Sequence, residues 1–536
     1  MARRRKHWGW GFEDEQPAAA ELEAIAAAIR GQLGFGGELR RPAPLPALRA
    51  PRLTPPPALS GLFDAGDHGR ARHAYGSSYR DVVRGFRGEY ESPPDLVAHP
   101  REEPELEQVL EWAIGAGAAV IPYGGGTGVV GGVEPSVGDG YEGVVTVDMQ
   151  ALDRVLEIDE ASLAARIQAG ASGPALEREL ARRGLTLRHF PQSFELQTLG
   201  GAIATRAAGH YATLRTRIDE FVESVRALTP AGVWESRRLP GSGAGVAPDR
   251  LLLGSEGTLG VITEAWVRVV PRPARRASIA VAFDSFEAGC GAVRAIVQSG
   301  LSPANCRLID GDEARITGAG DGDGALLVLG FESSEHDPAP LLAMAVAACG
   351  DHGGRPRAPG AGGDDRQVAA GGEGDPVASW REAFLRAPYL RDTMVAIGVL
   401  AETFETAITW ERLAEFRESV AGAARAALHE VCGAGTVTCR LTHVYPDGAA
   451  PYFTVLAPVR PGGELEQWEA VKRAASDAVI AGGGTITHHH AVGRDHRPWY
   501  DRQRPEPFAI ALAAAKSALD PSWALNPGVL IDRPPR

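Results

Sequence analysis

Apolar and polar residues follow two periods along the first half of the chain, and the two periods alternate. Over Glu103–Gly117 apolar residues recur every three or four positions, with Leu106, Val109, Leu110 and Ala113 on one face, which predicts an amphipathic helix. Short apolar runs between turn signals predict strands. The expected strands are 94–98, 120–122, 143–148, 164–169 and 261–270, and a second helix is expected at 173–183. Short strands mixed with helices favour an α+β domain.

The second half shows the pattern of an antiparallel sheet covered by helices. Its expected strands are 278–283, 326–332, 436–445 and 452–459, and its expected helices are 286–299 and 464–481. The last two strands are separated by turn residues, which predicts a hairpin. Because side chains alternate along a strand, Arg440 is expected on one face of this hairpin, and His443 and Tyr445 on the other.

A leader of different character precedes these patterns, and a low-complexity run interrupts the second half. Residues 7–12 are aromatic and glycine-rich and could pack against a larger body, 17–33 have helical spacing, and the proline-rich stretch 42–57 predicts an extended arm. Residues 351–375 are rich in Gly, Asp and Arg and predict a mobile loop.

Composition limits the classes of partner and the cell compartment that we expect. The chain has 536 residues and a formal net charge of −13, which argues against nucleic acid as a main partner. Its five cysteines are widely spread without a C-x-x-C pair, so a disulfide framework and a zinc site are not expected. No apolar run reaches the length of a membrane span. We expect a cytoplasmic protein, in peripheral contact with a membrane at most.

The densest chemical signal is a glycine-rich loop that follows a predicted strand. Such a loop presents bare backbone N–H groups to a phosphate or pyrophosphate. A Rossmann motif is excluded because Pro135 and two glycines forbid a helix next, and a nucleoside-triphosphate loop because no Lys-Ser/Thr follows. An ordinary surface turn is the remaining alternative. The candidate binding residues of this loop are Pro122, Tyr123, Gly124, Gly125, Gly126, Thr127, Gly128 and Val129.

Two further loops of small residues also lie beside predicted strands. In the second loop the candidates are Gln192, Ser193, Phe194, Glu195, Leu196, Gln197, Thr198, Gly201, Thr205, Arg206, Ala207 and Ala208. In the third they are Gly254, Ser255, Glu256, Gly257, Thr258, Leu259, Gly260, Val261 and Ile262. A helix capped at Thr198 would explain the second loop by itself, but three such loops together indicate one extended nucleotide site.

The three loops, PYGGGTGV, PQSFELQTLGGAIATRA and GSEGTLGVITEA, resemble the FAD-binding domain of the vanillyl-alcohol oxidase flavoprotein family. The resemblance implies an α+β fold with a two-subdomain FAD-binding domain of the PCMH type and a cap. It divides the chain into a leader (1–92), an FAD domain (93–272), a cap (273–500) and a segment returning to the FAD domain (501–536). No cysteine precedes Cys290 and no histidine lies between His99 and His189, so we expect non-covalent FAD.

Candidate chemistry in the second half lies at an arginine, a tyrosine and a histidine triplet. Arg391 could hold an anionic or carbonyl group, or pair with Asp392 or Glu402. Tyr452 could serve packing or exchange a proton beside a flavin. If the triplet His488, His489 and His490 is extended, the first and third share a face; it could bind metal, bind phosphate or relay a proton. We predict no metal.

The stretches RDTMVAIGVLAETFET, HVYPDGAAPYF, THHHAVG and the leading WGWG resemble the alkylglycerone-phosphate synthase (alkyl-dihydroxyacetonephosphate synthase) family. The resemblance implies exchange of the acyl group of acyl-dihydroxyacetone phosphate for a long-chain alcohol, through a flavin N5 adduct. Its implied catalytic residues are Tyr452 as acid/base and His488, His489 and His490; its implied substrate-binding residues are Arg391 toward the acyl chain, Arg440 and His443. We also expect a homodimer.

Two other functions compete with this one. An FAD-linked oxidase or dehydrogenase of a 2-hydroxy acid, of the D-lactate or glycolate type, would share all three flavin loops. A flavin-free lipid carrier or scaffold could keep the fold, although the intact loops argue against it. The sequence departs from the expected Gly-Val-Gly-Lys after the histidines, where it has Ala491-Val-Gly-Arg494.

Overall fold

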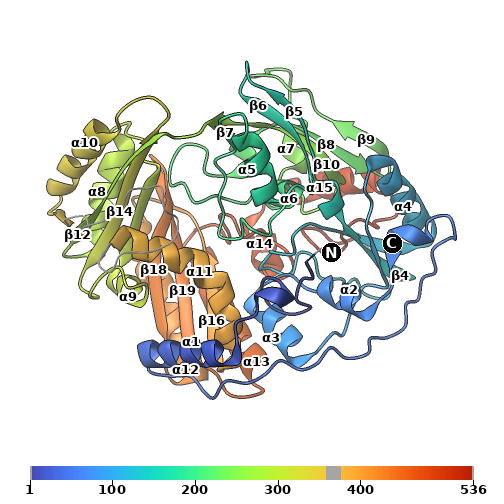
Figure 1. The fold of residues 1–536 in the computed structure, drawn as a ribbon, viewed down its shortest axis with the longest axis horizontal. Coiled ribbons are helices and arrows are strands. Elements are labelled where there is room, and N and C mark those ends of the chain that lie inside the picture. The colour runs from blue at the N-terminus through green and yellow to red at the C-terminus, as the bar shows by residue number, and fades with distance from the viewer. Residues whose placement is uncertain (1–2, 358–375, 534–536) are drawn as a thin grey trace.

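The computed structural model describes residues 3–357 and 376–533, arranged as two lobes (Figure 1). One lobe holds a four-stranded and a five-stranded sheet, and the other holds one large sheet with helices packed on it. This mixed architecture confirms the predicted α+β class with a separate cap. The exact boundaries at residues 92, 272 and 500 stay predictions.

The four-stranded sheet carries the first glycine loop at the end of a buried strand. Its order is β1 (Phe63–Asp64), β2 (Leu96–Ala98), β4 (Gly143–Asp148) and β3 (Ala118–Tyr123). The strands β2, β4 and β3 are parallel. The predicted amphipathic helix is α4 (Glu103–Gly115), and its apolar face packs on Val120 and Val145. The loop therefore leaves a rigid, buried strand.

The five-stranded sheet is antiparallel and carries the other two glycine loops. Its order is β5 (Val155–Asp159), β6 (Ala164–Gln168), β10 (Val261–Arg268), β8 (Val222–Thr229) and β9 (Gly232–Glu235). The helices associated with it are α5 (Gly173–Ala181), α6 (Leu199–Thr205), α7 (Asp249–Leu252) and α15 (Glu506–Leu519), with a short ribbon of β7 (Leu185–Thr186) and β11 (Val270–Pro271) beside them. Leu176, Ile203 and Leu512 share one apolar cluster with the sheet.

The cap sheet is antiparallel throughout. Its order is β15 (Arg355–Arg357), β12 (Arg275–Phe283), β14 (Ala325–Ser333), β13 (Asn305–Asp310), β18 (Thr436–Val444), β19 (Gly448–Pro458) and β16 (Val399–Glu405), and β17 (Ile408–Thr409) pairs with β19. One face buries α8 (Phe286–Gln298), α10 (Ala339–Gly350), α12 (Leu413–Cys432) and α13 (Glu464–Ala481) in the largest apolar cluster. The short α9 (Gly311–Ile316) has its own cluster with Ile309 and Leu326.

The hairpin β18–β19 corrects one prediction about side-chain direction. Its register shifts between Leu441 and His443, so Thr442 is an extra residue in β18. A bulge of this kind reverses the alternation beyond it. As a result Arg440 and His443, predicted on opposite faces, both line the same cavity.

The leader and the C-terminal segment are built into the two lobes. Helix α1 (Ala19–Leu33) packs on Ile397 and Val399, and α3 (Tyr79–Arg87) belongs to the cap core; α2 (Asp67–Arg72) lies between them in the chain. Residues 42–57 form neither helix nor strand, as predicted. The C-terminal chain, after α14 (Arg497–Gln503) and α15, returns to the four-stranded sheet, where Leu525 forms a parallel bridge with Val120.

The predicted loop at 351–375 is only partly within the described residues. Residues Arg355–Arg357 form β15, which pairs with β12 and corrects that part of the prediction; residues 358–375 lie outside the described part. Helix α11 (Pro376–Ala396) follows, with Pro388 in its interior. None of the helices in the described residues is both long enough and apolar enough to cross a membrane.

Candidate active site

A cavity of about 240 Å³ joins the two lobes, and most of the predicted site residues line it. The flavin-loop residues along it are Pro122, Gly124, Gly125, Gly126, Thr127, Gly128, Val129, Gln192, Ser193, Gln197, Thr198, Gly201, Thr205, Ala207, Ala208, Glu256, Gly257, Gly260, Val261 and Ile262. From the second half of the chain come Arg391, Arg440, His443, Tyr452, His489 and His490. Residues far apart in sequence thus surround one space.

The first two glycine loops touch, and this contact explains why their residues are small. A Cβ on Gly125 would lie 1.7 Å from the backbone oxygen of Leu196, and one on Gly124 would lie 2.3 Å from Thr198 Oγ1. Gly126 also has a left-handed φ of 64°. At Gly128, by contrast, a Cβ would meet no atom within 4 Å, and this residue borders the cavity. The loops form a surface of bare backbone because a side chain at Gly124 or Gly125 would separate them.

Thr198 connects this surface to α6. Its hydroxyl accepts from the backbone N–H of Gly201 at 3.2 Å and so caps the helix, as the capped-helix alternative required. The same hydroxyl lies beside Gly124. One side chain therefore both caps α6 and packs against the first glycine loop. The capped helix and the nucleotide site, the two interpretations of this loop, do not exclude one another.

Some predicted cofactor residues stand behind the cavity instead of lining it. They are Tyr123, Phe194, Glu195, Leu196, Arg206, Gly254, Ser255, Thr258 and Leu259. Tyr123 is buried against Arg72, whose guanidinium also donates to the Gly125 carbonyl at 3.0 Å. Arg206 ends α6 with a left-handed φ and pairs with Asp219. Tyr123 and Arg206 thus support the loops from outside the cavity.

Glu256 is the one carboxylate of the third loop, and it is buried in the cavity wall. It accepts from the backbone N–H groups of Val492 at 2.8 Å and Gly493 at 2.9 Å. Burial raises the pKa of Glu256 to about 7, although these two bonds act in the opposite direction. The carboxylate therefore joins the flavin loops to the chain that follows the histidine triplet.

On the cap side, Tyr452 lies at the centre of a row of three directly paired residues. Its strand neighbours are Arg440 on β18 and Glu405 on β16. Directly opposed residues of antiparallel strands place their side chains on the same face. The Arg440 guanidinium lies over the Tyr452 ring, 3.8 Å from its centre, and donates to Glu313 at 2.7 Å. A buried cation is thus fixed against the tyrosine.

Arg307 is a cavity residue that sequence reasoning missed. It comes from the middle of β13, is almost completely buried, and donates to the His210 carbonyl at 3.0 Å. Burial and the neighbouring Arg440 lower the pKa of Arg307 to about 9. The available signal is an arginine between the apolar residues Cys306 and Leu308 of a buried strand, because a buried charge needs a partner or a ligand.

The histidine triplet forms a tight turn around Glu405 and is not extended, which corrects the predicted sharing of faces. The backbone N–H groups of His488, His489 and His490 donate to the Glu405 carboxylate at 2.7, 2.9 and 2.9 Å. The Thr487 hydroxyl adds a fourth bond at 2.7 Å. Burial alone would raise the pKa of Glu405, but the histidines and these N–H groups hold it well below its usual range. Glu405 is a second residue that the sequence analysis missed.

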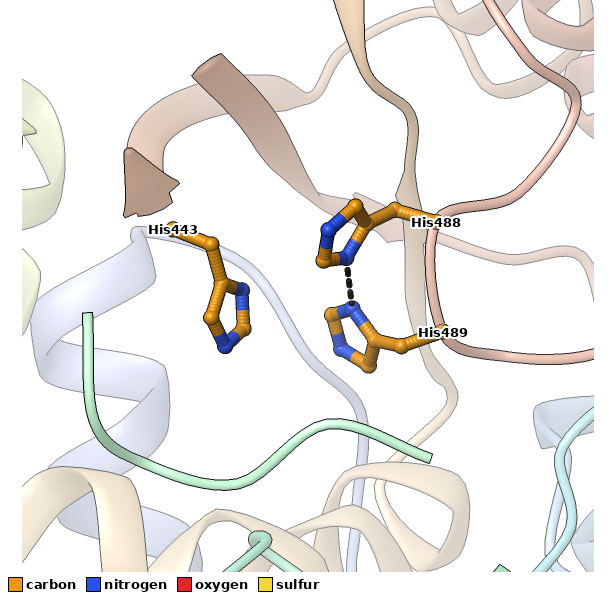
Figure 2. A group of neighbouring side chains, drawn as sticks. All are labelled: His443, His488 and His489. Atoms are coloured by element: carbon orange, nitrogen blue, oxygen red, sulfur yellow. Dashed lines mark hydrogen bonds between the residues drawn. The ribbon is translucent and has the colours of Figure 1, made fainter. Parts of the chain in front are cut away.

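The imidazoles form a packed group of neutral rings. Figure 2 shows His443 beside His488 and His489, with a 3.0 Å hydrogen bond between the Nδ1 atoms of the last two. Burial lowers the pKa of His488 to about 3 and lowers those of His443, His489 and His490 as well. His488 bonds Tyr445 and does not reach the cavity, whereas His489 and His490 do.

Two sets of these side chains have the spacing of metal ligands. They are His443 with His488 and His489, and Glu405 with His489 and His490. In the first set, His443 already has partners at both ring nitrogens, Thr442 Oγ1 and the Gly209 carbonyl. In the second, the Glu405 carboxylate holds the turn. The absence of a metal stays a prediction.

Comparison with known proteins agrees with this geometry. The model of an FAD binding domain matches residues 94–236, and that of the C-terminal domain of FAD linked oxidases matches residues 272–530. The alkyldihydroxyacetonephosphate synthase of Trypanosoma brucei brucei is 30% identical over 494 residues, which cover 87% of this chain and 78% of that protein. The chain belongs to the alkyldihydroxyacetonephosphate synthase family. This confirms the predicted family.

Other relatives extend the comparison. The synthase of Caenorhabditis elegans is also 30% identical, over 86% of this chain and 80% of its own. The glycolate oxidase subunit GlcD of Bacillus subtilis (strain 168) is 26% identical over 88% of this chain and 95% of its own. Among solved structures, an alkyldihydroxyacetonephosphate synthase matches with a TM-score of 0.78 at 23% identity, and p-cresol methylhydroxylase with substrate bound matches with 0.67 at 13%; they cover 97% of this chain and 98% of their own. These two likenesses show the fold.

As in the family's FAD-binding domain, FAD is the cofactor, and the cavity fits it. The bare Gly124–Gly128 loop would hold an anionic group, with the positive charge of Arg72 behind it. Gly200 and Gly257 also line the cavity, and a Cβ there would lie 2.6 Å from Ala169 Cβ or 2.9 Å from Pro122 Cγ, so these glycines keep the loops of the flavin surface close together. Tyr452 and Arg440 face this surface from the cap. In this member of the synthase family, the flavin loops and the cap residues therefore belong to one site.

Proposed function

We propose that the protein exchanges the acyl group of acyl-dihydroxyacetone phosphate for a long-chain alcohol and so forms an ether lipid. The observation that carries this proposal is the placement of Tyr452, between Arg440 and Glu405, in the cavity that the three flavin loops line. The similarity to synthases in trypanosome and nematode, over most of both chains, supports it.

Tyr452 is the proposed acid/base. Acting as a phenolate, its Oη would take a proton from the carbon beside the substrate carbonyl, become a phenol, and return the proton after the exchange. The Arg440 cation over the ring would balance the negative charge of the phenolate. The His489 ring is stacked near the Tyr452 ring, with ring centres 6.2 Å apart. Because its pKa is lowered, His489 is neutral and can accept or donate one hydrogen bond. FAD, when bound, supplies an electron-rich ring that can act as a nucleophile.

The substrate phosphate would be held by the positive charge of the cap side. Arg307 and Arg440 both line the cavity, and both lie near the Glu313 carboxylate. Guanidinium groups in a cavity wall match the geometry of a phosphate and favour such an anionic ligand. Arg391, whose guanidinium donates to the Ser77 carbonyl at 2.7 Å, is proposed to contact the acyl-chain side. His443 completes the proposed substrate contacts.

The mode of flavin binding, the location in the cell and the oligomeric state are also proposals. We propose that FAD is bound non-covalently, since the flavin-loop residues described in the cavity wall include neither cysteine nor histidine. A lipid substrate favours peripheral contact of an otherwise cytoplasmic protein with a membrane, and we keep the homodimer as a proposal. Acid precipitation tests the first statement, because a non-covalent flavin stays in the supernatant.

The test is one incubation of flavin-loaded protein with acyl-dihydroxyacetone phosphate and a labelled long-chain alcohol, followed by mass spectrometry. Labelled ether lipid that disappears with Tyr452→Phe supports the proposal. A lack of ether, together with bleaching of the flavin by 2-hydroxy acids, contradicts it and assigns the protein to the activity class of the glycolate oxidase relative.

A further inference from the structure

The segment Arg3–Phe12, here called the strap, reaches the cavity from the far end of the sequence. Its backbone folds back on itself, with a bridge between Arg5 and Phe12. Trp10 is almost completely buried and lines the cavity together with Ser77, Pro388 and Arg391. An aromatic ring from the leader therefore forms part of the wall at which Arg391 stands.

A buried carboxylate fixes Trp10 in this position. The Trp10 backbone N–H donates to both oxygens of Asp392, at 3.1 and 2.9 Å, and Lys6 pairs with the same carboxylate at 3.4 Å. A Cβ on Gly9 would lie 2.4 Å from Asp392 Oδ2, and Gly9 has a left-handed φ of 68°. The glycine thus permits the close approach between strap and carboxylate.

Further contacts join the strap to the first flavin loop, to α11 and to α3. Arg5 donates to the Gly125 carbonyl of the first flavin loop at 3.4 Å. Trp10 meets the Tyr389 ring edge to face, with centres 6.4 Å apart. Trp8 packs on Phe86 of α3, with ring centres 5.2 Å apart, and is not part of the cavity wall. The strap is therefore a fixed part of the site, and its two tryptophans have different surroundings.

We propose that Trp10 is a specificity-determining residue, which limits the length of the alkyl or acyl chain accepted at the Arg391 end of the cavity. This inference rests on the proposed function, because it takes a lipid chain as the occupant. An indole is large, rigid and apolar, and beside an arginine it offers a chain a surface to pack on while the charge stays toward the polar head. Asp392 is a positioning residue that acts through Trp10.

The test measures binding without turnover. Flavin-loaded protein is titrated with straight-chain primary alcohols of increasing length, and the change in flavin absorption gives the affinity for each. Trp10→Ala opens the wall, so the preferred chain becomes longer. We expect the ratio of affinities for the longer over the shorter alcohol to rise about tenfold or more, equivalent to roughly two buried methylenes.

Matched variants separate this role from a structural one. Trp8→Ala removes the same side chain from the same strap but leaves the chain-length preference within twofold of wild type. Trp10→Phe shifts the chain-length preference less than Trp10→Ala does. Gly9→Ala displaces the contact with Asp392 but retains the indole, and it shifts the chain-length preference in the same direction as Trp10→Ala.

Two outcomes overturn the inference and are distinguishable. If wild type shows a preferred chain length and Trp10→Ala keeps it, only the role of Trp10 is wrong. If no alcohol of any length perturbs the wild-type flavin, the lipid substrate of the proposed function is wrong as well.

Discussion

The two walls of the cavity are built in opposite ways. The flavin wall consists mainly of backbone, with glycines at Gly124, Gly125 and Gly128 and one buried carboxylate, Glu256. The cap wall consists of charged and aromatic side chains from a sheet, among them Arg307, Arg440 and Tyr452. Backbone offers N–H groups to a constant cofactor, whereas side chains can be arranged around one particular reaction.

The difference also determines how a mutation damages each wall. In the flavin wall, a single added methyl group separates two loops, because the obstacle is backbone. In the cap wall, removal of one charged side chain leaves its partner buried without compensation, which costs more than a lost contact. The predictions below break or sharpen this contrast, from the largest expected effect to the smallest.

Glu405→Ala has the largest expected effect. The backbone N–H groups of His488 and His489 and the Thr487 hydroxyl lose the acceptor that holds the turn, and the His490 N–H keeps its bond to Thr487 Oγ1. We expect a loss of about 3–5 kcal/mol in the free energy of unfolding. Denaturant titration measures it, and turnover should fall below detection because His489 and His490 shift. Glu405→Gln keeps one acceptor oxygen and should lose less; equal losses in both variants would contradict the carboxylate's role in the turn.

Arg440→Met removes the guanidinium that donates to buried Glu313, which keeps the Thr438 hydroxyl as a donor and Arg307 as a nearby charge. We expect a loss of about 3 kcal/mol in stability and a large loss of turnover. Adding Glu313→Gln should restore much of the stability but not the turnover, since the cation over Tyr452 is still missing. Turnover that returns with stability would mean that Arg440 has a structural role alone.

Glu256 predicts a pH dependence of stability on the flavin side. Its folded pKa of about 7 is above the usual value of a glutamate, so its contribution to stability is full at low pH and is lost as the pH rises toward and through 7. The full change is about 3 kcal/mol. Thermal unfolding of wild type between mildly acidic and neutral pH should therefore show a downward slope that Glu256→Gln reduces. An unchanged slope would contradict the raised pKa.

Arg182→Ala has the smallest expected effect. Arg182 pairs with Glu179 at 2.8 Å, but both side chains are exposed. Water and salt screen such a pair, so we expect a change below about 0.5 kcal/mol in stability and none in turnover. Denaturant titration beside Arg440→Met gives the direct contrast between an exposed and a buried pair. A loss comparable to that of Arg440→Met would refute the distinction.

The same contrast explains how much could be predicted from the sequence. The flavin wall could be predicted because each loop is a short continuous run, and a run such as Gly124–Gly128 shows its backbone character locally. What the sequence did not show is which residues face the cavity. Tyr123 and Arg206, for example, support the loops from behind, because their partners Arg72 and Asp219 lie elsewhere in the chain.

In the cap wall the residue types could be predicted but not their partners. The histidine triplet was evident, yet its organising carboxylate, Glu405, lies on a separate strand. Arg440 and Tyr452 were evident, but the bulge at Thr442 that brings His443 to the same cavity depends on hydrogen bonds between strands. Trp10 was visible only as part of an aromatic leader, since a contact with Asp392 across nearly the whole chain leaves no local signal.

The measurement that tests the account most directly is the turnover per bound flavin of Gly125→Ala and Tyr452→Phe, with flavin content determined from absorbance. We expect Gly125→Ala to lose most of its flavin, because its Cβ would lie 1.7 Å from the Leu196 carbonyl oxygen. We expect Tyr452→Phe to keep its flavin and to form ether lipid at a rate reduced by about 100-fold or more. A Tyr452→Phe protein with wild-type turnover, or a Gly125→Ala protein with full flavin, would contradict the division between a backbone wall that binds the cofactor and a side-chain wall that performs the reaction.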